Sequence, residues 1–137
     1  MSKGNTTEND IIQVVFRNNV DPSWRTNANL YLALHTADPG EAGGQSTSEA
    51  DYTNYARVAV TKDASGWTVS GNQASNAALV QFPQCGGGTN TITHVSIGTL
   101  STGVGQILYS GALSSSLAVS NLIQPQFAIG ALVVSED

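Results

Sequence analysis

From residue 28 onward, the chain consists of short stretches of alternating side chains separated by turn signals. Leu30, Leu32 and Leu34 lie at every second position, and Val58 and Val60 repeat the spacing. A period of two puts alternate side chains on opposite faces of a β-strand. The pattern predicts strands over 28–36, 56–61, 66–70, 77–82, 91–97 and 106–113, and one interrupted strand within 122–134.

Short strands at this spacing, with no helix recurring between them, are typical of a sandwich or barrel and not of a parallel βαβ fold. We therefore expect an all-β chain, a single antiparallel β-sandwich or jelly-roll-like domain with one short N-terminal helix. This single β domain would cover residues 1–137, with an N-terminal arm and helix over 1–20 and the β core over 28–137.

The N-terminal segment has a different period. Apolar residues four positions apart predict a helix over 6–18, because such pairs share one helical face. Asp21-Pro22 forbids continuation beyond it. The apolar residues are Ile11, Ile12, Val15 and Phe16, the proposed caps are Thr6 or Thr7, and the proposed terminators are Asn18 and Asn19.

Charge limits the classes of partner. Charged residues make up 11% of the chain and the net charge is −5, against about 25% charged residues in ordinary domains. Binding to nucleic acid needs a basic patch, so we expect no nucleic-acid partner, and an anionic membrane is disfavoured for the same reason. The first residues hold no apolar signal region, and the single Cys85 leaves no internal disulfide, which fits synthesis in a reducing cytoplasm.

No motif of a catalytic centre is present. His35 and His94 lack the spacing of a zinc site, nothing basic lies near Cys85, and a strand instead of a helix follows Gly86-Gly87-Gly88. We expect no enzymatic activity, no cofactor and no metal. The acidic residues Asp38, Glu41, Glu49 and Asp51 could gather a calcium ion, but a solvated loop is the favoured reading.

Candidate interface residues lie in and around a long polar loop. Residues 40–51 are rich in Gly, Ser and Thr, and long loops often become ordered on a partner. We expect the loop 39–54 to be flexible, and aromatic side chains beside it to anchor an interface or pack in the core. The candidates are Trp24, Tyr52 and Tyr55 with Asp38, Glu41, Glu49 and Asp51.

Four segments, in order along the chain, resemble a family of small tailed-bacteriophage virion proteins that are often labelled tail fibre proteins. They cover 30–43, ending in Asp-Pro-Gly-Glu-Ala-Gly; 55–60, Tyr-Ala-Arg-Val-Ala-Val; 93–98, Thr-His-Val-Ser-Ile-Gly; and 108–113, Leu-Tyr-Ser-Gly-Ala-Leu. The chain departs from the family at His35, where many relatives have Phe, and in the polar run 114–116. The resemblance implies a structural virion protein and brings no catalytic residues with it.

The chain has no repeats and no coiled-coil segment that could build a fibre shaft. We therefore expect a capsid decoration or cement protein, a homotrimer that binds the major capsid protein and copies of itself on the capsid exterior, made in the cytoplasm of the bacterial host. The alternative is a tail-tip or tail-fibre-associated adaptor. An alternative of another class is a carbohydrate-binding β-sandwich module with Trp24, Tyr52 and Tyr55 as sugar platforms.

Overall fold

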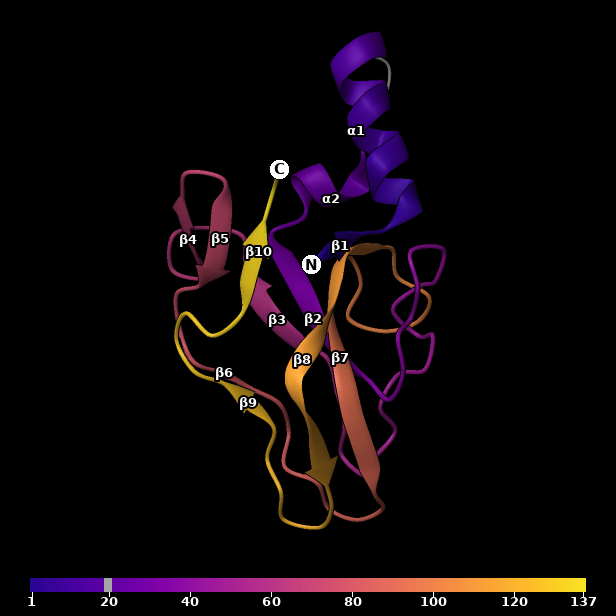
Figure 1. Cartoon of the computed structure of the whole chain (residues 1–137), viewed down its shortest axis with the longest axis vertical. Coiled ribbons are helices and arrows are strands. Elements are labelled where there is room, and N and C mark those ends of the chain that lie inside the picture. Colours follow the sequence, from indigo (N-terminus) through magenta and orange to yellow (C-terminus); the bar gives the residue numbers. More distant parts are fainter. Residues whose placement is uncertain (19–20) are drawn as a thin grey trace.

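The computed structural model describes residues 1–18 and 21–137 and is dominated by antiparallel β structure (Figure 1). The expected all-β class with one short N-terminal helix is confirmed. The elements are β1 (Ser2–Lys3), α1 (Asn5–Arg17), α2 (Ser23–Thr26), β2 (Asn29–His35), β3 (Val58–Thr61), β4 (Trp67–Ser70), β5 (Gln73–Asn76), β6 (Val80–Gln81), β7 (Asn90–Gly98), β8 (Ile107–Val119), β9 (Gln126–Phe127) and β10 (Val133–Ser135).

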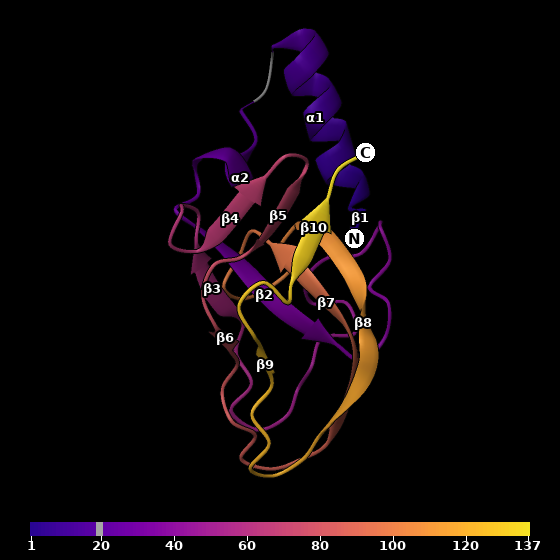
Figure 2. The same cartoon turned by 60° about the vertical axis from the view of Figure 1, so that its left-hand side comes forward.

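The strands form one large sheet and two small ones. The large sheet has five strands in the order β1-β8-β7-β2-β3, and the small sheets have the orders β10-β5-β4 and β6-β9. All pairings are antiparallel. The small sheets lie beside one face of the large sheet (Figure 2), and side chains from all three sheets meet in the core. The arrangement is sandwich-like.

Aromatic rings fill the middle of the core. Phe82, which follows β6, is fully buried. Its ring stacks on Tyr55 with centroids 6.4 Å apart and meets Phe127 edge-on at 6.3 Å. Aliphatic side chains of β2 and β7 complete the core, with Leu32, Leu34, Ile92, Val95 and Ile97 all buried. Alternation therefore predicted the core face of β2 correctly, whereas in β7 Ile92 shares the core with Val95 and Ile97, which strict alternation places on the opposite face.

Strand β8 is longer than the predicted 106–113. Its pairing with β7 shifts register between Ile92 and His94, so residues 113–116 lie opposite Thr93 as a bulge. Pairing resumes at Leu117↔Ile92 and continues to Val119↔Asn90. A serine run carries no alternating apolar residues, so the sequence pattern could not show that the strand continues beyond it.

The last part of the chain was predicted less well. The strand expected over 77–82 is reduced to β6, and the stretch 122–134 holds two short strands, β9 and β10. Strand β5 was missed because its sequence, Gln-Ala-Ser-Asn, is polar. Its Asn76 is buried and bonds to three backbone groups: the amide Nδ2 donates to the carbonyls of Ala78 and Ala128, and Oδ1 accepts from the N–H of Leu132.

Helix α1 projects beyond the sheets at one end of the molecule in both views (Figures 1 and 2). Asn18 ends it in the left-handed conformation with φ 47°, as predicted, whereas Asn19 lies outside the described residues. The predicted caps were wrong: Gly4 is the N-cap. Thr7 instead is buried against β8, where its hydroxyl donates to the carbonyl of Ile107 at 2.9 Å.

Core burial sets the first prediction. Ile92→Ala removes a side chain with no solvent exposure and should lower the free energy of unfolding by about 2–5 kcal/mol, since a cavity remains. Ile129→Ala, at a side chain that is 70% exposed, should change it by less than about 0.5 kcal/mol. Urea denaturation of both variants tests this, and equal losses would contradict the assigned core.

Candidate interaction surfaces

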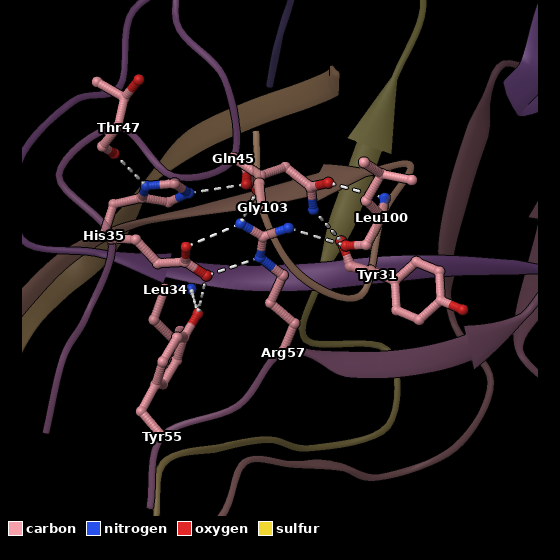
Figure 3. Close-up of polar contacts among 11 residues, drawn as sticks. Tyr31, Leu34, His35, Gln45, Thr47, Tyr55, Arg57, Leu100 and Gly103 are labelled. Atoms are coloured by element: carbon pink, nitrogen blue, oxygen red, sulfur yellow. Dashed lines mark hydrogen bonds and ion pairs between the residues drawn. The ribbon is translucent and has the colours of Figure 1, made fainter. Parts of the chain in front are cut away.

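The segment between β2 and β3 is folded against the large sheet, and Gln45 is its central residue. Gln45 is fully buried. Its amide Nε2 donates to the carbonyl of Tyr31 at 3.0 Å, and its Oε1 accepts from the N–H of Leu100 at 3.0 Å (Figure 3). A Cβ atom at Gly98 or Gly105 would overlap this side chain. One loop residue thus closes the space where β2, β7 and the loop before β8 meet.

His35 holds the same segment from the other side. Its Nδ1 lies 2.8 Å from the carbonyl of Thr47, which can only accept, so Nδ1 carries the proton. Nε2 then accepts from the hydroxyl of Ser96 at 2.7 Å. Burial of the ring lowers the pKa of His35 below its usual value. His35 is therefore a neutral structural residue.

A buried ion pair closes the segment near its end. The guanidinium of Arg57 binds both carboxylate oxygens of Glu49, at 2.7 and 2.8 Å. It also donates to the carbonyls of Leu100 and Gly103. The hydroxyl of Tyr55 accepts the N–H of Leu34 and donates to Glu49 (Figure 3). Because the Arg57 side chain is only 2% exposed, this pair acts as an internal brace.

The expectation of a flexible loop over 39–54 is therefore wrong. Its backbone and buried side chains are tied to the sheet by hydrogen bonds that a Gly- and Ser-rich sequence does not reveal. Tyr52 is also internal, since its hydroxyl donates to the carbonyl of Pro83 at 2.8 Å, and burial raises its pKa to about 12. Three candidate interface residues, Glu49, Tyr52 and Tyr55, are thus structural.

The other candidates lie apart from one another. Trp24 donates its Nε1 to Asp10 at 2.9 Å, and the Nζ of Lys62 lies 5.9 Å from its ring centroid. Asp38, Glu41 and Asp51 are exposed and bond locally: Asp38 accepts from the N–H of Gly40, Glu41 from Ser2, and Asp51 from Asn90. A sugar platform of Trp24, Tyr52 and Tyr55 does not form, because the two tyrosines face the core.

The remaining reactive side chains are also held locally. Cys85 is buried, with its Sγ 3.2 Å from the carbonyl of Gly87, and the glycines 86–88 connect β6 to β7. His94 is half-buried and its Nδ1 lies 2.8 Å from the hydroxyl of Thr93. Among residues 1–18 and 21–137, no three His, Cys, Asp or Glu side chains lie close enough together to hold a metal ion.

Helix α1 carries an apolar face that no other part of the described chain covers. Within Asn5–Arg17, Thr7 is the one fully buried residue. Ile12, Val15 and Phe16 are 56%, 65% and 76% exposed and lie on one helical face. We call these three side chains the α1 stripe. The apolar pattern predicted the helix correctly, but it gave no sign that the apolar face lies outside the core.

A second apolar surface is a groove of about 780 Å³ that opens between the large sheet and the sheet of β4, β5 and β10. Val69 is 73% exposed within it. Its apolar lining is Leu30, Trp67, Val69, Ala74, Ile97, Tyr109 and Val134, and Lys62, Asp63 and Glu136 lie at its rim. We call this feature the β4 groove.

Charged side chains are absent from one long stretch of the chain, which lies outside α1. Residues 64–135 contain no Asp, Glu, Lys or Arg, so every such side chain belongs to the first 63 residues or the last two. Large apolar side chains are nevertheless exposed in this neutral stretch, among them Val104, Leu122 and Ile129. Exposed apolar residues with little charge around them are typical of surfaces that neighbouring molecules cover.

The antiparallel sheets, the braced loop and the exposed apolar side chains together describe a small β-sandwich module. The chain matches, over residues 2–135, the family model described as podophage GP4 fiber I protein gp80. It belongs to this family and is a structural protein of a tailed-phage virion. A search of curated proteins found no match. No helix in the described part of the chain is long and apolar enough to cross a membrane.

The buried imidazole predicts a pH dependence. In the unfolded chain His35 takes up a proton near pH 6.5, whereas in the fold its lowered pKa resists protonation. The free energy of unfolding should therefore decrease as the pH falls below about 6.5. His35→Gln should lose this component, and His94→Gln should keep it. Urea denaturation between about pH 7.5 and pH 5.5 measures it, and an unchanged slope in His35→Gln would refute the assignment.

The brace predicts a stability difference between two arginines. Arg57→Lys replaces a planar group that binds Glu49 and two carbonyls at once and should cost about 2 kcal/mol or more, because a lysine cannot reproduce the fork. Arg25→Lys, at an exposed pair with Asp21, should change stability by less than about 0.5 kcal/mol. Thermal unfolding of both variants decides whether the brace is structural.

Proposed function

We propose that the chain is a non-enzymatic component of the phage tail fibre that works by binding other virion proteins and copies of itself. The observation that carries this proposal is the match to a fibre-protein family over residues 2–135, which spans the whole sandwich. The internal roles of His35, Cys85 and the Glu49–Arg57 pair support the absence of catalysis, since each is engaged in holding the fold.

Contact-making is also what the surface chemistry favours. A protein that keeps itself soluble as a monomer usually carries interspersed charge, and this chain has none over 64–135. In an assembly the same surface is covered by neighbours, and repeated weak contacts combine through avidity. Symmetric positions in a virion favour symmetric oligomers, so a homotrimer remains the prediction for the assembled state.

The family description favours the tail over the capsid among virion positions. Capsid decoration, the role first expected from chain length and composition, remains the competing proposal, together with a tail-tip adaptor. The two locations predict different defects: a cement protein stabilises a pressurised shell by binding the assembled lattice, whereas a fibre component connects the particle to its host.

Phage with this gene disrupted would distinguish the two. We expect DNA-filled heads that release DNA at the same temperature as wild type, bind host cells poorly and lack density at the tail in a cryo-EM difference map. Supplying the wild-type chain in the host during assembly should restore adsorption. Missing density on the capsid, with DNA release at lower temperature and normal adsorption, would overturn the fibre proposal in favour of decoration.

A further inference from the structure

The α1 stripe and the β4 groove are two exposed apolar surfaces of the chain. The first is a helix face, and the second is a groove of the kind that binds helices. We propose that α1 of one copy lies in the β4 groove of a second copy, with the α1 stripe against the groove lining. The contact needs no other virion protein, and it stands whether the chain occupies the tail or the capsid.

The spacing of the stripe is that of a helix that binds in a groove. Ile12, Val15 and Phe16 follow an i, i+3, i+4 pattern, the arrangement by which amphipathic helices dock their apolar face. The groove lining is aromatic and aliphatic, and its volume of 780 Å³ falls within the range of about 300–1,000 Å³ of cavities that hold compact apolar groups.

Charges at the two surfaces are also complementary. Arg17 follows Phe16 in the last turn of the helix, and Asp63 lines the groove. Of the other charged lining residues, Glu136 is paired with Lys3, and the ammonium of Lys62 donates to two backbone carbonyls. The pKa of Asp63 is lowered by its hydrogen bonds with Ser65 and Thr61, which keeps this carboxylate negative. Arg17 of the docked helix can therefore pair with Asp63 while the stripe enters the apolar part of the groove.

The helix does not cover its own stripe because its first turns are fixed in a different orientation. Thr7 bonds the carbonyl of Ile107, and Asp10 accepts from the side chains of Trp24 and Gln106. These contacts fasten the polar side of α1 to the body and turn Ile12, Val15 and Phe16 outward. Because these contacts fix the orientation of α1, its apolar face points in one defined direction.

A ring of copies covers both apolar surfaces, whereas a bundle of α1 helices would leave the groove open. The stripe offers roughly 300 Å² of apolar surface, so each contact is smaller than the standard of about 800 Å² per partner. When each copy contributes a helix to one neighbour and a groove to another, every chain makes two such contacts, and these combine through avidity.

The helix and the groove are different patches, so the contact is heterologous and closes when the last copy binds the first. The mass of the purified full chain tests it by light scattering coupled to gel filtration. We expect a multiple of 14.2 kDa, three in a homotrimer, for the wild type. Phe16→Ser and Val69→Ser should each reduce the mass to one chain. Val104→Ser, at a 78% exposed loop residue outside both surfaces, should leave it unchanged.

Mixing the two variants gives a sharper test. Phe16→Ser keeps an intact groove and Val69→Ser keeps an intact α1 stripe, so the mixture should form a complex of two chains that neither variant forms alone. Circular dichroism and thermal unfolding establish that both variants are folded. A monomeric wild type, a Val69→Ser variant that keeps the wild-type mass, or a mixture that stays monomeric would each overturn the proposal.

Discussion

The fold depends on a small number of buried polar side chains, such as Gln45 and His35, in which each nitrogen or oxygen atom has a hydrogen-bond partner. Gln45 shows the constraint most clearly, because it reaches from a loop into the sheet and bonds backbone groups of β2 and of the segment after β7. A buried amide is tolerated only when its donors and acceptors are paired. Pairing also requires space, and glycine at positions 98 and 105 supplies it. The loop that contains Gln45 is therefore fixed to the large sheet.

Alternation predicted the strands of the large sheet that carry regularly spaced apolar side chains. Strands β2, β3 and β7 follow Leu30, Val58 and Ile92, and their bounds differ from the predicted ranges by two residues at most. Strand β5 and the continuation of β8 carry Ser, Gln and Asn, and they are strands because neighbouring backbone pairs with them. Such tertiary pairing overrides local propensity and leaves no periodic signal.

For the candidate surfaces, too, some features could be predicted from the sequence and others depend on tertiary contacts. Tyr52, Tyr55 and Glu49 were expected at an interface because of their residue types. Their hydrogen-bond partners include residues distant in the sequence, such as Pro83 for Tyr52, and these bonds hold the side chains inside the protein. The helix was predicted from Ile12 and Phe16, but the direction of its apolar face follows from Thr7 and Asp10, whose partners in β8 and α2 no local pattern indicates. The neutral stretch 64–135, in contrast, can be read directly from the sequence.

That neutral stretch determines how the surface responds to its medium. Contacts between ionised groups weaken as dissolved ions shorten the Debye length from about 30 Å at 0.01 M to about 3 Å at 1 M. Apolar contacts have no such dependence, and strongly hydrated salts strengthen them. Contacts made by a surface of residues without Asp, Glu, Lys or Arg should therefore lose little strength between dilute and concentrated salt.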